Sequence, residues 1–332
     1  MSNSYLKVLH FDLESSVIFA VSADFPRCFN ANNRIMKHKT LILRLIAAIC
    51  LIAGPLTAGA QIFYKVTGNG LKAPAYLFGT HHLAPNSMVD SVPGVRDALA
   101  QADNLIVEVV MTNPVEMAGK LQKYMFAPAD STLSSFFSAD EFARMDSVCG
   151  TIAPGVSLKM FNAMKPMAVN SALTMMLVAK DLAETGQLDS WFMTEAKNEG
   201  KELTGLETPE FQAELLFNSV PLQRQAEMLK EMLDDPEETV SRMKELNRAY
   251  MAQDAPALLA LSEEEDDDAE FTDALQRKRN DNWMKVLPDL FAESKSFVAV
   301  GLLHLLGDEG LVKRLRDLGY TVEAVAADPE RH

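Results

Sequence analysis

Two β-rich runs separated by a turn signal open the patterned part of the chain. The stretch QIFYKVTGNGLKAPAYLFGT, residues 61–80, places β-branched and aromatic positions on either side of Gly68-Asn69-Gly70. Glycine and asparagine favour the positive φ angles that a tight hairpin turn requires. The pattern therefore predicts a hairpin whose second strand is Ala75–Phe78.

A helical pattern and a buried-looking strand come next. In DSVPGVRDALAQAD, Val95 and Leu99 share one helical face, and Ser91 or Asp90 is the expected helix cap. The following NLIVEVV, residues 104–110, is an almost unbroken apolar run of the kind found in strands that are covered on both faces. Together these segments predict a strand, loop, helix, strand unit.

The middle of the chain has mainly helical patterns. Residues 114–186 are helical and rich in methionine, and residues 202–207 form a brief strand. Long helices are predicted through 221–233 and 237–254. Methionine in such helices most simply fills the core or lines a groove.

The last patterned segment repeats the order of the first unit. SFVAVGLLHLLGDEGLVKRLRDLGYTVEAV, residues 296–325, reads as strand, glycine, histidine, helix and final strand. Asp308 is the expected helix cap, Leu315 and Leu318 lie on the expected apolar face, and Gly319 ends the helix. The predicted fold is α/β: a central mixed β-sheet flanked by helices, with two related strand-GxxH-helix-strand units and a helical insertion between them.

The amino terminus has the pattern of a secretory signal. MKHKTLILRLIAAICLIAGPLTAGA, residues 36–60, has a basic start, an apolar core and a small-residue end. Residues 1–35 are then a non-native upstream extension, translation starts at Met36, and 61–332 form a single mature domain. That domain is expected in the periplasm or outside the cell, without a membrane span. The alternative is an uncleaved anchor, although Arg44 leaves an apolar stretch that is short for a span.

Charge and cysteine content narrow the possible partners. Six Lys or Arg and three Asp or Glu lie in the first sixty residues, which leaves 25 basic against 43 acidic residues in the rest. Such an acidic chain argues against nucleic acid and anionic membrane surfaces as partners. Cys149 is the one cysteine of the predicted mature chain, so that chain forms no internal disulfide.

The spacing G-x-x-H occurs twice, each time directly after an apolar strand. The first copy is Gly79-Thr80-His81-His82 and the second is Gly301-Leu302-Leu303-His304. Loops at the carboxyl ends of strands are where open α/β sheets bind ligands. The duplicated spacing predicts that His82 and His304 share one pocket. His81 has no counterpart, since Leu303 stands in its place, and its role in the site stays open.

Glu108 lies in the apolar run IVEVV, where a carboxylate must be paired, hydrogen-bonded or bound to a metal. Two imidazoles and a carboxylate suit a divalent ion of the Mn, Co or Zn type, which can generate a bound hydroxide. The predicted ligands are His82, His304 and Glu108, with His81 as a possible addition. The alternative is that the histidines are satisfied polar residues at strand ends.

Other polar residues give weaker signals. Glu207 follows a short strand, and Arg279 with Asn280 lies on a helix, where Arg279 could hold a substrate carboxylate or a site glutamate in bidentate fashion. The alternatives are a helix-capping glutamate and a surface arginine. Asp189 is either a carboxylate that supports a metal ligand or a helix cap. There is no G-x-S-x-G elbow, and Cys149 has no histidine nearby in the sequence, so serine and cysteine nucleophiles are poor candidates.

Several ordered segments resemble the TraB/GumN family of bacterial secreted proteins, which is related to the TIKI-type metalloproteases. The segments are YLFGTHHLAP, ADNLIVEVV, LDSWFMTEAKNEGKELTGLET, RKRNDNW and VAVGLLHLLGDEGLVKRLRDLGYTVE, over residues 63–325. The resemblance implies an α/β fold of two related halves and, in the TIKI branch, metal-dependent peptide cleavage by two G-x-x-H motifs with a glutamate.

Carried over to this chain, the resemblance implies His82 and His304 as metal ligands or catalytic histidines, with Glu108 as their carboxylate partner. The family's GLET glutamate matches Glu207, and its Arg-Asn pair matches Arg279 and Asn280.

The sequence therefore predicts a metal-dependent hydrolase, peptidase-like, that acts on a peptide or another small substrate. Glu108 or Glu207 would move the proton, and Arg279, beside Asn280, would orient the substrate. One alternative is a non-catalytic metal- or haem-binding protein of the same fold. Another is an interaction protein with a degenerate site.

Overall fold

The computed structural model describes residues 62–110, 114–185, 187–263 and 269–325. The predicted upstream extension and signal peptide lie outside the described residues. Among the described helices, none combines the length and the hydropathy of a membrane span.

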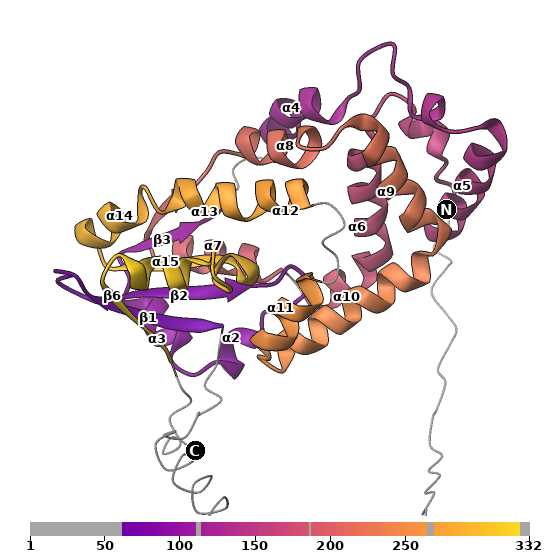
Figure 1. Cartoon of the computed structure of the whole chain (residues 1–332). Coiled ribbons are helices and arrows are strands. Elements are labelled where there is room, and N and C mark those ends of the chain that lie inside the picture. The colour runs from indigo at the N-terminus through magenta and orange to yellow at the C-terminus, as the bar shows by residue number, and fades with distance from the viewer. Residues whose placement is uncertain (1–61, 111–113, 186, 264–268, 326–332) are drawn as a thin grey trace, which may run out of the picture. The chain divides into compact units, whose positions relative to one another are not determined.

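The described part of the chain contains a mixed sheet with helices beside it (Figure 1). Its six strands lie in the order β4-β3-β5-β2-β1-β6. The neighbours β4, β3, β5 and β2 are parallel, whereas β1 pairs antiparallel with both β2 and β6. The bounds are β1 Phe63–Gly68, β2 Ala75–Thr80, β3 Asn104–Val107, β4 Glu202–Gly205, β5 Ser296–Gly301 and β6 Tyr320–Ala324. The prediction of an α/β fold with a mixed sheet and flanking helices is confirmed.

The predicted hairpin is the pair β1 and β2, which are antiparallel with Phe63 opposite Phe78. At the turn, Gly68 and Gly70 both have φ of 81° and Asn69 has φ of 46°. These left-handed conformations cost little for glycine and are tolerated by asparagine. The Gly-Asn-Gly signal therefore sets the turn, and the turn brings β1 back alongside β2.

Helices make up most of the other described residues. The α-helices are α2 Met88–Ser91, α3 Val95–Gln101, α4 Pro114–Met125, α5 Ala139–Ile152, α6 Pro166–Thr185, α7 Leu188–Asn198, α8 Pro209–Asn218, α9 Leu222–Asp234, α10 Pro236–Met251, α11 Ala255–Glu263, α12 Ala269–Leu275, α13 Arg277–Trp283, α14 Leu287–Glu293 and α15 Leu311–Asp317. Short 3₁₀ helices are η1 Leu133–Phe136, η2 Leu158–Phe161 and η3 Leu302–His304. Between β3 and β5 the secondary-structure elements of the described residues are helices, with β4 as the exception. In this segment α6 packs against α9, and α4 packs against α8 (Figure 1).

An aromatic cluster attaches α7 to the sheet. Phe192 of α7 lies 5.1 Å from Phe78 of β2 and 5.3 Å from Phe297 of β5, measured between ring centroids. All three side chains are fully buried. Burying one such ring contributes about 1.5–3 kcal/mol, and close ring pairs add to this. The packing fixes the start of α7, including Asp189, near the loop that follows β2.

The carboxyl ends of the four parallel strands lie at one edge of the sheet. Thr80 at the end of β2 is opposite Gly301 at the end of β5, and Val107 of β3 is opposite Gly205 of β4. Glu108 was expected inside a strand, but β3 ends at Val107 and Glu108 follows it. The predicted site residues that follow β2, β3, β4 and β5 therefore meet at one edge.

The helix after β2 does not begin as expected. Its amino-terminal cap is Gly94, with φ of 83°, and neither Ser91 nor Asp90 caps it. Both of those residues belong to the short preceding helix α2, where Asp90 pairs with Arg96 instead. The side-chain cap prediction is wrong because both residues lie within the extra turn α2, and residues 92–94 separate that turn from α3.

The last helix differs in a similar way. Helix α15 begins after Gly310, so Asp308 does not cap it. Leu315 is fully buried as expected, whereas Leu318 is 50% exposed. Leu318 follows the end of the helix, and Gly319, with φ of 90°, turns the chain into β6 as predicted.

Substituting Gly79→Ala tests how closely the loop after β5 approaches β2. A Cβ at Gly79 would lie 2.3 Å from Leu302 Cδ1 and 2.9 Å from Leu302 Cα. We expect the free energy of unfolding in urea to fall by about 1–3 kcal/mol. Gly119→Ala is the matched control, since nothing lies within 4 Å of its Cβ. Because Gly119 lies in α4, that control should gain about 0.5–1 kcal/mol. A Gly79→Ala variant as stable as the wild type would contradict the close packing.

Candidate functional site

The centre of the candidate site is the buried guanidinium of Arg279. Helix α13 carries RKRNDNW, and its inner face presents Arg279, Asn280 and Trp283 while Arg277 and Lys278 stay exposed. Arg279 is only 6% exposed, so the alternative of a surface arginine is wrong. A guanidinium in such a position needs acceptors in every direction that its five N–H groups face.

Two glutamates supply most of those acceptors. Arg279 Nε donates to both carboxylate oxygens of Glu207, at 3.0 and 3.1 Å, and Nη2 donates to Glu207 and to Glu108. Nη1 donates to the Leu275 carbonyl oxygen at 3.2 Å. Glu207 also accepts from the Trp283 indole N–H at 3.2 Å, and it does not cap helix α8, whose cap is Thr208.

The two glutamates are linked a second time by Gln212 of α8. Its side-chain nitrogen donates to Glu108 at 3.3 Å and to Glu207 at 3.2 Å. Glu108 further accepts the Gly301 backbone N–H at 2.8 Å, which ties the end of β3 to the end of β5. Burial alone would raise the pKa of Glu108. The positive charge of Arg279 and the Gly301 N–H outweigh burial and lower the pKa to about 2, so Glu108 is an anion at neutral pH.

His304 is held in one neutral tautomer. Arg279 Nη1 lies 2.9 Å from His304 Nε2 and can only donate, so Nε2 accepts. The proton is therefore on Nδ1, which donates to Asn280 Oδ1 at 2.9 Å. Burial, reinforced by the charge of Arg279 and opposed by Glu108, lowers the pKa of His304 to about 4. His304 then adds no positive charge beside Glu108 at neutral pH.

Asn280 fixes the loop that carries His304. Its side-chain nitrogen donates to the carbonyl oxygens of His304, at 3.1 Å, and Glu309, at 2.9 Å. Asn280 is 1% exposed, and every polar atom of its side chain is used within the protein. The arrangement makes Asn280 a residue that positions His304.

His82 has a different environment, although its G-x-x-H spacing is the same. Its side chain is 80% exposed, and its Nδ1 lies 3.0 Å from Asp189 Oδ2. The hydrogen bond that His82 donates to Asp189 raises the pKa of His82, and desolvation by the surrounding site opposes this effect. The charge of Glu108 also raises the pKa. Because Nδ1–H is oriented by a carboxylate, Nε2 of the neutral ring has its lone pair available.

A cavity of about 750 Å³ lies beside this pair. Its polar wall includes His81, His82, Asp189, Glu108 and Gln212. Most other lining residues are apolar, and five of them are methionines from helices α6, α7, α9 and α10: Met167, Met175, Met193, Met228 and Met243. The methionine-rich helices thus form a cavity wall next to the predicted site.

His81 also lines this cavity, on the side of Tyr250. The ring centroids of His81 and Tyr250 are 5.3 Å apart, and the Tyr250 hydroxyl donates to the Gly79 carbonyl oxygen at 2.7 Å. Burial, together with the neighbouring His82, lowers the pKa of His81 to about 4. Its buried Nε2 has no hydrogen-bond partner in the described part of the chain.

The predicted site residues thus form two groups at one edge of the sheet. Glu108, Glu207, Arg279, Asn280 and His304 belong to a single hydrogen-bonded network.

His82 lies outside that network and is bonded to Asp189, which the sequence left open between a cap and a supporting carboxylate. The charges of Glu108 and Arg279 still act on the pKa of His82. This electrostatic influence connects the two groups.

Sequence reasoning missed Gln212 and Trp283. Trp283 stands four residues after Arg279 and therefore on the same helical face, a signal that could have been used. Gln212 is an ordinary helical glutamine in PEFQAELLFN, and nothing in its local sequence marks it. Its role follows from the position of α8 beside β3 and β4.

The predicted metal ligands do not form a binding set as they are arranged. Within the described ranges, no three His, Cys, Asp or Glu side chains are grouped to hold a metal ion. Both ring nitrogens of His304 are used by Arg279 and Asn280, and both oxygens of Glu108 accept hydrogen bonds. A divalent ion at this set would require Arg279 to move, so the metal prediction stays a prediction.

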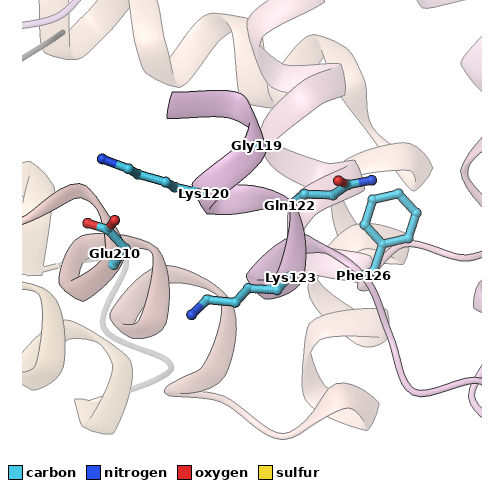
Figure 2. Close-up of a pocket in the computed structure, with 6 residues that line it drawn as sticks. All are labelled: Gly119, Lys120, Gln122, Lys123, Phe126 and Glu210. Carbon is cyan, nitrogen blue, oxygen red and sulfur yellow. The ribbon is translucent and has the colours of Figure 1, made fainter. Parts of the chain in front are cut away.

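A second hollow, of about 520 Å³, lies on helix α4 and contains none of the predicted site residues. Figure 2 shows Lys120 and Lys123 extending from α4 on the side of Glu210, whereas Phe126 lies on the other side. The hollow on α4 thus shares no lining residue with the cavity at the sheet edge.

Comparison with known proteins gave one family match. A family model described as the TraB/PrgY/gumN family matches residues 62–324, which is nearly the whole described part of the chain. No curated protein matches the chain, and no solved structure does.

Replacing Arg279 tests whether the buried network stabilises the fold as a unit. Arg279→Met leaves Glu108 and Glu207 without their cation, so we expect the free energy of unfolding in urea to fall by about 3–5 kcal/mol. Arg277→Met on the same helix removes only exposed pairs with Asp273 and Asp281, and an exposed pair typically contributes at most about 1 kcal/mol.

A triple variant identifies the cause of that loss. Adding Glu108→Gln and Glu207→Gln to Arg279→Met removes the uncompensated buried charges, so stability should recover in part. Equal costs for Arg279→Met and Arg277→Met, or no recovery in the triple variant, would contradict a charge-coupled network.

Proposed function

This chain belongs to the TraB/PrgY/gumN family, and from that premise we propose that it is a peptidase-like hydrolase that cleaves an amide or ester bond of a peptide or other small substrate. The observation that supports the proposal is the His82–Asp189 pair at the cavity wall, beside the ionised Glu108. A histidine oriented by a carboxylate and open to a cavity is suited to moving protons at neutral pH.

The proposed step uses water as the nucleophile. His82 Nε2 takes a proton from water as the water oxygen bonds to the substrate carbonyl carbon. The bond to the leaving group then breaks, and the imidazolium returns the proton to the leaving nitrogen or oxygen. Asp189 and Glu108 favour the protonated ring electrostatically, because the negative charges of both lie near it.

The two glutamates predicted to move the proton are less suited to it than His82. Glu207 has a side chain that is 3% exposed, and Arg279 and Trp283 occupy both of its oxygens. Glu108 lines the cavity, but with a pKa of about 2 it is a weak base at neutral pH. In this proposal Arg279 acts by holding both glutamates in place, and Asn280 acts by positioning His304.

The family premise is also compatible with binding without hydrolysis, and the size of the cavity favours that second candidate. About 750 Å³ is within the usual range of small-molecule sites. A binding protein would retain a ligand in the cavity and release no product, which separates the two candidates experimentally.

For either candidate function, we propose a periplasmic or extracellular location, because residues 36–60 have the pattern of a cleaved signal. Amino-terminal sequencing of the exported protein should show Gln61 as its first residue. A protein that starts at Met1 would contradict the cleaved signal.

Hydrolysis is tested with the mature chain, residues 61–332, and a library of peptides and acyl esters. We expect His82→Gln to lower the rate constant of cleavage by about 10²–10⁴-fold, because the proton acceptor is lost. Asp189→Asn should lower it less, since the ring remains but is no longer oriented by a charge. Asp90→Asn, which alters an exposed pair with Arg96, is the matched control and should keep full activity.

Circular dichroism and urea unfolding show whether each variant is folded. Cleavage that persists unchanged in a folded His82→Gln protein would overturn the proposed role of His82. Absence of cleavage by the wild type across the library would favour the binding candidate.

The metal prediction is tested separately, and no step above depends on it. Titration calorimetry with Mn²⁺, Co²⁺ and Zn²⁺ should show one ion per mature chain if His82, His304 and Glu108 bind it. Binding should then be lost in His82→Ala and weakened in His304→Ala and Glu108→Gln, since each removes one ligand. An ion that stays bound in all three variants would exclude this set.

A further inference from the structure

We infer that the cavity beside His82 binds a long apolar chain whose polar head is uncharged or positively charged, and that it discriminates against a carboxylate head. This inference deepens the proposed function: the ligand with the long apolar chain is the substrate only if the protein is a hydrolase, so that identification rests on the proposed function. The binding itself is a separate property of the cavity.

The apolar part of the cavity suits a flexible chain. Met167 and Met193 are largely buried, whereas Met175 is 47% exposed, so the methionine wall extends from the core to the surface. Unbranched thioether side chains adapt to irregular apolar ligands. Leu216, Leu246 and other apolar side chains make up most of the remaining lining, although Asn170, Ser171 and Thr174 of α6 also line the cavity. A chain of methylene groups would lose contact with water along the apolar part.

The polar end of the cavity is acidic. Glu108 is held as an anion, and the Asp189 carboxylate lines the same cavity. The described residues that line the cavity include no lysine or arginine.

Neither nearby cation of the site is available to a ligand anion. The hydrogen-bond donors of Arg279 are directed to Glu108, Glu207, His304 and Leu275. His82, when protonated, is already paired with Asp189. A carboxylate head would therefore enter a negative region without a cationic partner, whereas an amide or ammonium head finds acceptors there.

The test compares three ligands with the same ten-carbon chain: decylammonium, decanamide and decanoate, each below its micelle concentration. Titration calorimetry with the mature chain, residues 61–332, should show that decylammonium and decanamide bind at least tenfold more tightly than decanoate. Shortening the chain by one methylene should weaken binding about fourfold. Asp189→Asn should reduce the preference for decylammonium over decanoate, because one negative charge is removed.

Two methionines of helix α10 give a matched pair for the chain-binding part. Met243 lines the cavity, whereas Met251 is 40% exposed and is not among the lining residues. Met243→Gln should weaken binding of decanamide several-fold, and Met251→Gln should leave it unchanged. Equal effects of the two variants, equal affinity for decanoate and decylammonium, or no binding of any of the three would overturn the inference.

The outcomes separate the inference from the proposed function. Selective binding with no cleavage of any amide or ester that carries such a chain would support the inference and contradict hydrolysis. Cleavage of short peptides together with no binding of ten-carbon ligands would contradict the inference and leave hydrolysis supported.

Discussion

The pairing of one buried arginine with two partly buried glutamates is the interaction on which the site depends. Arg279 binds Glu108 and Glu207, and these residues come from helix α13, from the end of β3 and from the end of β4. Each of the three charges would be costly to bury alone, so each one requires the others. Their mutual requirement fixes α13 across the carboxyl ends of the parallel strands.

That pairing also gives the two histidines different roles. Arg279 donates to His304, which imposes one neutral tautomer and leaves the ring without a free nitrogen. His82 stands outside the pairing, exposed at the cavity wall and oriented by Asp189. The two copies share the G-x-x-H spacing, but both ring nitrogens of His304 are hydrogen-bonded within the protein, whereas His82 is exposed at the cavity wall.

The electrostatic character of the cavity follows from the same arrangement. The positive charge of Arg279 is used within the network, so it is not offered to a ligand. The carboxylates of Glu108 and Asp189 line the cavity, and most of its other lining residues are apolar, with methionines from four helices among them. The cavity is therefore mainly apolar with acidic side chains at its polar wall, although the adjoining hydrogen-bonded network contains the positive charge of Arg279.

The sequence by itself determined the elements and the edge at which they meet. Alternation, apolar runs and turn glycines are local signals, and they were sufficient for the hairpin, for most strands and for the position of both G-x-x-H loops at strand ends. The carboxylate of Glu108 in the apolar run IVEVV requires a charged or hydrogen-bonding partner, so the sequence also indicated Glu108 as a site residue. The tertiary structure alone decided which partner it found. Arg279 lies 171 positions from Glu108, Gln212 lies 104 positions from it, and Asp189 lies 107 positions from His82. Such pairings depend on how helices pack across the sheet, and packing is set by the summed burial of many side chains rather than by any local pattern.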